Sequence, residues 1–250
     1  MTPPPPTALD PHAGDFLLRR LDELYKAKAY EHADGLVDEL LEIYPNTETA
    51  AHALCLRSLS LRTRDDQEAA FWDLLTAADQ GTGRWSMQSG FRAGVQAQMM
   101  KWYDRARVVF ELVAAKWSRD LTAVSAAREL SYIHRDDPEK RAFWKQAQVD
   151  LLHRLICNPK PDSDEDLDAL SEAVEIFLER DDDGGEPRDL EKATSCAQEL
   201  LRRATERGQR ERIRDAELGL IAIESRRPLN LVRVLESQGD NPRMLLGKLD

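Results

Sequence analysis

A tyrosine–alanine pair recurs at long range in this chain, each time at the start of a helical pattern of apolar residues. Tyr30 and Ala33 stand three positions apart, and Tyr103 and Ala106 repeat that spacing. The two alanines are 73 residues apart, slightly more than two periods of about 34 residues. Self-similarity at this distance indicates helix pairs that stack on one another, because one pair alone cannot bury its apolar face.

Weaker copies lie between and after these two. The segment DQEAAFWDLLTAA supplies Ala69 or Ala70 as the intermediate copy. Ala142 follows Ala106 by 36 residues, and Ala193 comes 51 residues later, with RDDDGGEPRD as an inserted loop in that longer interval. The residues expected on the packed face after these two alanines are Phe143, Gln146 and Val149, then Ala197 and Leu200.

Each copy is preceded by a second stripe of apolar or small residues at helical spacing. A small residue such as Gly94 lets the following helix approach closely. The chain has no alternating strand pattern, and it reads as about ten amphipathic helices with short connections. The stripes are Leu17, Leu21 and Leu24; Ala51, Leu54 and Ser58; Gly90, Ala93, Gly94 and Ala97; Ala123, Ala126, Ala127 and Leu130; and Leu167, Leu170, Val174 and Phe177.

The segment KAYEHADGLVDELLEIYPNT, with its echo around Tyr103, resembles the tetratricopeptide repeat family over roughly residues 14–207. The resemblance implies an all-α fold, a right-handed α-solenoid of about five to six antiparallel helix pairs. The expected organisation is a disordered Pro-rich tail at 1–13, a repeat domain at 14–227 and a C-terminal capping helix and tail at 228–250. Within the domain we expect units near 14–47, 48–83, 85–118, 119–158 and 163–207, then a helix at 209–227. The tail from 240 to 250 either caps the last apolar face or forms a partner-binding segment.

The net charge of −11 is concentrated in one region. Residues 162–191 contain 14 Asp and Glu against two Arg, so the rest of the chain is close to neutral. An acidic surface repels a phosphate backbone, so nucleic acid is not an expected partner. The Arg-rich stretch after Lys192 is expected to lie against the acidic helix and neutralise it; its arginines are Arg202, Arg203, Arg207, Arg210, Arg212 and Arg214.

Cysteine usage and hydropathy point to the cytoplasm. Cys55, Cys157 and Cys196 are odd in number and widely spaced, as expected of buried free thiols in a reducing compartment. No apolar run approaches the roughly 18 to 20 residues that a membrane span needs. The first residues, MTPPPPTALDPHAG, lack the basic and apolar regions of a secretory signal.

In the resembled family the first helix of each pair lines a concave groove, which implies where a partner would bind. The implied groove residues are Leu18, Asp22, Tyr25, His52, Leu56, Phe91, Val95, Gln98, Met99, Arg128, Tyr132, Glu172 and Glu175. Ser60 is also implied for the second unit. Aromatic and Met side chains make good anchors for a peptide, although packing between repeats would equally explain them. Acidity rises toward Glu172 and Glu175, so we expect an amphipathic, partly basic partner segment.

Candidate chemistry is sparse. His52 and Cys55 lie three apart on one predicted helix, the spacing of a thiolate–imidazole pair or half a metal site, but no third ligand follows at a motif spacing. The run from Glu179 to Gly184 begins like a calcium loop, yet Leu190 stands where the closing Glu is needed. We therefore expect no catalytic residues, no metal and no cofactor.

The leading functional prediction is a cytoplasmic, non-catalytic protein–protein interaction module, acting as an adaptor, chaperone or regulatory subunit. Its partner would be a peptide or helical segment of another protein, and neither nucleic acid nor a membrane. One alternative is a ligand-sensing or enzymatic domain on a helical solenoid. Another is a self-assembling structural protein, and hence a homo-oligomer.

Overall fold

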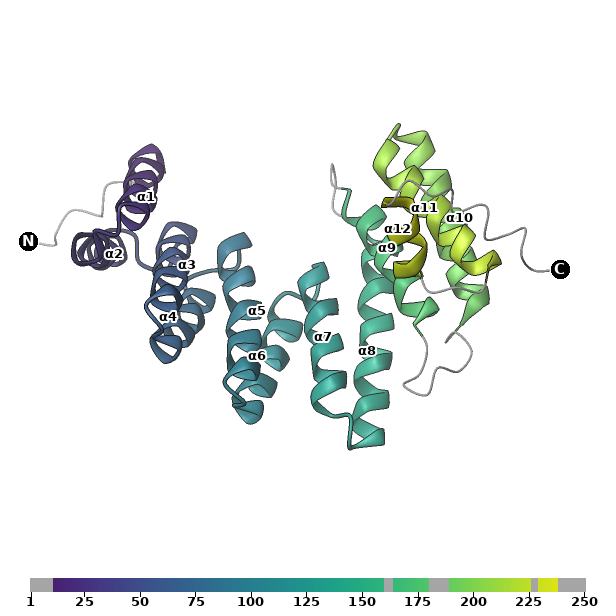
Figure 1. Ribbon diagram of the computed structural model, residues 1–250, viewed down its shortest axis with the longest axis horizontal. Coiled ribbons are helices and arrows are strands. Elements are labelled where there is room, and N and C mark those ends of the chain that lie inside the picture. Colours follow the sequence, from purple (N-terminus) through teal and green to yellow (C-terminus); the bar gives the residue numbers. More distant parts are fainter. Residues whose placement is uncertain (1–10, 160–163, 180–188, 226–228, 238–250) are drawn as a thin grey trace, which may run out of the picture. The chain divides into compact units, whose positions relative to one another are not determined.

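The computed structural model describes residues 11–159, 164–179, 189–225 and 229–237, and all regular structure in that part of the chain is α-helix (Figure 1). The helices are α1 (Pro11–Lys26), α2 (Tyr30–Ile43), α3 (Glu48–Thr63), α4 (Gln67–Asp79), α5 (Arg84–Met99), α6 (Tyr103–Lys116), α7 (Leu121–Ile133), α8 (Pro138–Cys157), α9 (Glu165–Leu178), α10 (Leu190–Glu206), α11 (Arg210–Glu224) and α12 (Leu229–Ser237). The expected all-α fold is confirmed for these residues. Helix α1 begins three residues before the expected start at 14. Most of the Pro-rich tail, the inserted loop at 180–188 and the tail from 238 lie outside the described residues.

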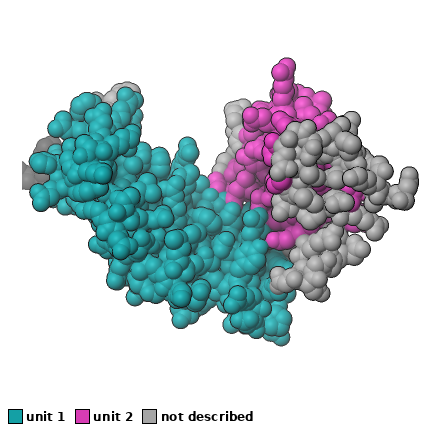
Figure 2. Space-filling model, in the orientation of Figure 1, with its two compact units in different colours: residues 1–118, 122–148 teal, residues 119–121, 149–250 magenta. Residues whose placement is uncertain are grey.

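The chain divides into two compact units (Figure 2). Unit 1 comprises residues 1–118 and 122–148, and unit 2 comprises residues 119–121 and 149–250. Consecutive helices pack together from α1 to α6 in unit 1 and from α9 to α12 in unit 2. Alternate helices also meet: α1 packs on α3, α3 on α5, and α9 on α11. The sequence pattern, read as one array from 14 to 227, contains no sign of the division.

One turn recurs inside the first three helix pairs of unit 1. Lys28, Asp65 and Lys101 each have a positive φ, between 57° and 63°, in the left-handed region. The residue after each turn residue donates its N–H to a carbonyl five positions earlier, as in Ala29 N to Leu24 O at 2.9 Å. This arrangement satisfies the carbonyls at the end of the first helix and reverses the chain into the second helix.

The turns give the true register of the repeat. Ala33, Ala70 and Ala106 each stand five residues after a turn residue, and all three are fully buried. Ala70 rather than Ala69 is therefore the intermediate copy. The intervals are 37 and 36 residues, longer than the expected period of about 34 residues.

The small residues of α5 are required by the close approach of α6. A Cβ added to Gly94 would lie 2.5 Å from the ring of Phe110, which is fully buried. Gly90, Ala93 and Ala97 are buried on the same face. The expectation that this stripe admits the next helix closely is confirmed.

Successive pairs are joined by polar caps as well as by apolar packing. The carboxylate of Glu48, the first residue of α3, accepts hydrogen bonds from Gly83 N at 3.0 Å, Trp85 N at 2.6 Å and Ser86 Oγ at 2.7 Å. Glu48 therefore caps the N-terminus of α5, where a negative charge is favourable. A Cβ at Gly83 would lie 2.5 Å from the Glu48 carboxyl carbon, so this close approach requires glycine.

The fourth pair departs from the sequence prediction. Ala142, Phe143 and Gln146 were expected on the packed face of α8, but all three are exposed, Phe143 by 63%. The buried side chains of α8 come later and are Gln148, Leu151, Leu152 and Leu155. The connection before α8 has four residues, 134–137, where the first three pairs have three. Helix α7 is also shorter than the first helices of the earlier pairs, so α8 begins only 35 residues after α6. Counting 36 residues from Ala106 therefore selects a position one residue past the buried face.

Unit 2 combines a small apolar core with ion pairs. Leu167, Leu170, Leu200 and Ala216 are buried together, so the expected apolar face of α9 is confirmed. Asp166 on α9 is 0% exposed and pairs with Arg203 at 2.9 Å and with Arg207 at 2.7 Å. Asp168 pairs with Arg212 of α11. The expectation that the Arg-rich stretch neutralises the acidic helix is confirmed for these three arginines.

Candidate functional site

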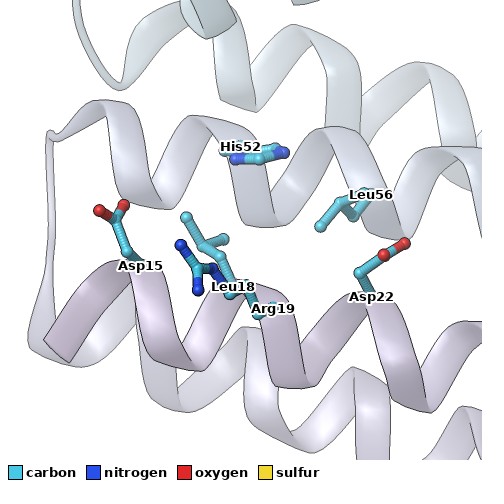
Figure 3. A pocket seen from close by; sticks show the side chains of 6 residues that line it. All are labelled: Asp15, Leu18, Arg19, Asp22, His52 and Leu56. Carbon is cyan, nitrogen blue, oxygen red and sulfur yellow. The ribbon is translucent and has the colours of Figure 1, made fainter. Parts of the chain in front are cut away.

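Four of the expected groove residues meet at a surface pocket of about 490 Å³ between α1 and α3 (Figure 3). The lining residues are Asp15, Leu18, Arg19 and Asp22 from α1 with His52 and Leu56 from α3. The α1 residues recur at spacings of three or four, which places them on one helical face. His52 and Leu56 are likewise four residues apart on one face of α3. Helix α1 packs on α3, and both side chains line the pocket between the two helices.

The charges of the pocket are mixed. Asp15 and Asp22 stand at its two ends, and Arg19 extends between them (Figure 3). Asp22 pairs with Lys26 one turn along α1, at 2.5 Å. Within the described part of the chain, neither Asp15 nor Arg19 makes an ion pair, so both charges face the pocket without a fixed protein partner.

His52 forms one wall through an aromatic stack. Its ring lies flat on Trp85, with ring centroids 3.7 Å apart and planes inclined by 7°. Burial lowers the pKa of His52, and the nearby carboxylates of Asp22, Asp15 and Glu48 offset that effect only in part. At neutral pH the imidazole is therefore uncharged, and the wall that it forms is aromatic rather than cationic.

The remaining expected groove residues of unit 1 lie on α5, which packs on α3, and on α7. Phe91 is half-buried, with its ring 5.6 Å from that of Phe110, so it is partly a packing residue. Val95 is half-buried, and Met99 is exposed by 62%. Gln98 donates to Glu129 at 3.0 Å. On α7, Arg128 is half-buried and Tyr132 is exposed.

Tyr25 is held by the scaffold. Its hydroxyl donates to Asp34 Oδ1 at 2.9 Å, and its ring packs on the core shared by the first two helix pairs. Burial, together with the bond to Asp34, raises the pKa of Tyr25 well above its usual value. Tyr25 therefore links α1 to α2. Of the two roles expected for the aromatic residues, partner binding and packing between helices, the structure shows packing for Tyr25.

The structure corrects the expected register of α3 at two positions. Ser60 was expected in the groove but is buried, whereas Leu59 is 44% exposed and was missed. Leu59 occupies the place of Asp22 in α1 and Val95 in α5, six residues before the turn residue of each pair. The intervals of 37 and 36 residues were the signal that would have found it.

The last two expected groove residues lie on α9 in unit 2. Glu175 pairs with Arg233 of α12. Glu172 is half-buried on the same helix. The acidity that was expected to attract a basic partner is thus already engaged by the chain's own arginine at Glu175, as it is at Asp168.

The structure separates the residues that suggested chemistry. Cys55 is buried in the apolar core, where its Sγ accepts from Arg92 Nη1 at 3.1 Å. His52 instead faces the pocket, stacked on Trp85. The cysteines are free, but the expectation that all three are buried is wrong, because Cys157 is exposed and Cys196 half-buried. Across the described ranges, no three His, Cys, Asp or Glu side chains are grouped to hold a metal ion.

No helix in the described part of the chain combines the length and the apolar character needed to cross a bilayer. The chain matches no protein-family model and no curated protein sequence.

Proposed function

We propose that unit 1 is a non-catalytic protein-interaction module of the tetratricopeptide type, which binds a peptide or helical segment of another protein along α1, α3 and α5. The pocket between α1 and α3 carries the proposal. It lies between the first helices of two consecutive pairs, where this type of scaffold presents its groove. It also combines an apolar floor with charged ends, the composition of many recognition sites.

The surface beyond the pocket supports the same activity. Four aliphatic or Met side chains are half-buried or exposed on the neighbouring first helices α3 and α5: Leu56, Leu59, Val95 and Met99. Exposed aliphatic and Met side chains flanked by polar groups mark interaction sites more often than catalytic ones. We place the activity in the cytoplasm, because the three cysteines are unbridged.

Affinity purification from native lysate, followed by quantitative mass spectrometry, tests this function. Leu56→Glu and Val95→Glu each place a charge on the proposed surface. Val108→Glu on α6 is the matched control, since Val108 is exposed and lies on a second helix. Because Leu56 and Val95 also pack partly on the core, circular dichroism is used to confirm that every variant is folded at the temperature of the purification.

We expect a set of proteins recovered with the wild type and with Val108→Glu to be lost with both groove variants. Recovery of the same proteins with all four forms would contradict binding on this surface.

A further inference from the structure

Helix α12 contacts both α9 and α11 in unit 2, so it is an example of a helix bound by a pair of neighbouring helices. Leu229 and Val232, three residues apart, are buried on one face of α12. Arg233 pairs with Glu175 of α9, and Glu236 accepts from Arg214 of α11 at 2.6 Å. This short helix is thus held by an aliphatic pair and by one ion pair to each of its two neighbours.

The α1–α3 pocket of unit 1 has a comparable framework. Helices α9 and α11 flank α10 and pack on each other, just as α1 and α3 flank α2 and pack on each other. In unit 2 the pair contacts α12. In unit 1 the corresponding pair lines an open pocket.

The pocket also offers the groups that would hold a helix of this kind. Leu56 is half-buried and provides the main aliphatic contact, while Leu18 is largely buried in the core and reaches the pocket only with its edge. Asp15 can accept from a basic side chain. Arg19 can pair with a carboxylate on the next turn of the same ligand helix. Neither Asp15 nor Arg19 has an ion-pair partner among the described residues, so a ligand would not have to break an existing pair.

We propose that the α1–α3 pocket binds a helical segment of another protein that shares the chemistry of α12. Such a segment has two aliphatic residues three positions apart, an Arg or Lys directly after the second, and an acidic residue three positions further on. This inference rests on the proposed function and specifies the partner. The mixed charges of the pocket favour this ligand over a uniformly basic one, because Arg19 lies between the two carboxylates.

A peptide with the sequence of residues 226–240, labelled with fluorescein, provides the probe, and fluorescence anisotropy against the full chain measures its affinity. We expect saturable binding that Leu56→Glu weakens by about tenfold or more and that Val108→Glu leaves unchanged. Peptides carrying Val232→Asp or Arg233→Glu should bind at least about tenfold more weakly than the unaltered peptide.

A photo-crosslinking residue in place of Val234, which is exposed on α12, locates the bound peptide. Crosslinks to α1 and α3 support the proposal. Crosslinks confined to α9 and α11 would mean that the peptide only replaces the chain's own α12, and would overturn it.

Absence of binding, or binding insensitive to Leu56→Glu, would also overturn the proposal. If lysate proteins still depend on Leu56 in that case, the proposed function stands and only this description of the partner fails. Dimerisation that requires Leu56, seen by light scattering with the full chain alone, would identify the occupant as a second copy and would equally overturn it.

Discussion

Asp166 is the residue whose replacement should most disturb unit 2. Its buried carboxylate accepts three charge-assisted hydrogen bonds, from Arg203 Nη1 at 2.9 Å and from Arg207 Nη1 and Nη2 at 2.7 and 2.8 Å. Removing one partner of a buried ion pair costs roughly 3–5 kcal/mol. Arg203 and Arg207 keep 22% and 37% of their side chains exposed, and Arg203 also pairs with Glu199. We therefore expect Asp166→Asn to lower the free energy of unfolding by about 2–3 kcal/mol.

Urea denaturation followed by circular dichroism measures the loss, and hydrogen exchange of the α9 and α10 amides shows that it falls in unit 2. Asp168→Asn is the control, because Asp168 is partly exposed and pairs with Arg212 of α11. It should cost at most about 1 kcal/mol. A loss below about 1 kcal/mol for Asp166→Asn, or one equal to that of the control, would refute the reasoning.

The pH dependence provides a second check on Asp166. Burial alone would raise the pKa of this carboxyl, but the bonds from Arg207 and Arg203 outweigh burial and lower it. A carboxyl with a lowered folded-state pKa stabilises the fold above its ordinary pKa, and this stabilisation is lost as the pH falls through the folded-state value. The difference in stability between wild type and Asp166→Asn should therefore be full at neutral pH and shrink in acid.

Three further predictions concern unit 1. Glu48→Ala removes the cap that accepts three hydrogen bonds at the start of α5, so it should lower the free energy of unfolding by about 2 kcal/mol, measured by urea denaturation. An unchanged free energy of unfolding would mean that water replaces the cap. Gly94→Ala should destabilise the protein by about 1–3 kcal/mol, because the added Cβ would meet the Phe110 ring. Gly35→Ala should stabilise it by up to about 1 kcal/mol, because no atom lies within 4 Å of an added Cβ there. Equal melting temperatures for the two variants would contradict this packing account. Because burial lowers the pKa of His52, its neutral imidazole stabilises the fold, and this stabilisation is lost as the pH falls below about 6.5. NMR titration should give His52 a lower pKa than those of exposed histidines. A higher pKa would be evidence against the stacked geometry.

The all-helical fold could be predicted from the sequence because the buried residues of a helix recur at spacings of three or four. Leu21, Ala33, Ala93 and Ala106 are buried as their spacing predicted. The pocket residues Leu18, Asp22, His52 and Leu56 were also selected from the sequence, since residues three or four apart share a helical face whatever packs against it. The opposite charges of α9 and the Arg-rich stretch likewise predicted their pairing.

Other features depended on contacts that no local pattern encodes. The buried face of α8 was misassigned because α8 begins 35 residues after α6 instead of 36, and a shift of one residue turns the expected face by about 100°. The exposed face of α3 was misassigned at Leu59 and Ser60 for a different reason: most positions of this helix are small or apolar, so the sequence does not show which side meets a neighbour. Tyr25 and Glu175 are residue types that often occur in binding surfaces. Only the tertiary structure shows that Tyr25 is bonded to Asp34 and that Glu175 is paired with Arg233. Local periodicity therefore determined which segments are helices, whereas packing between distant helices decided which polar groups are already engaged and which remain open to a partner.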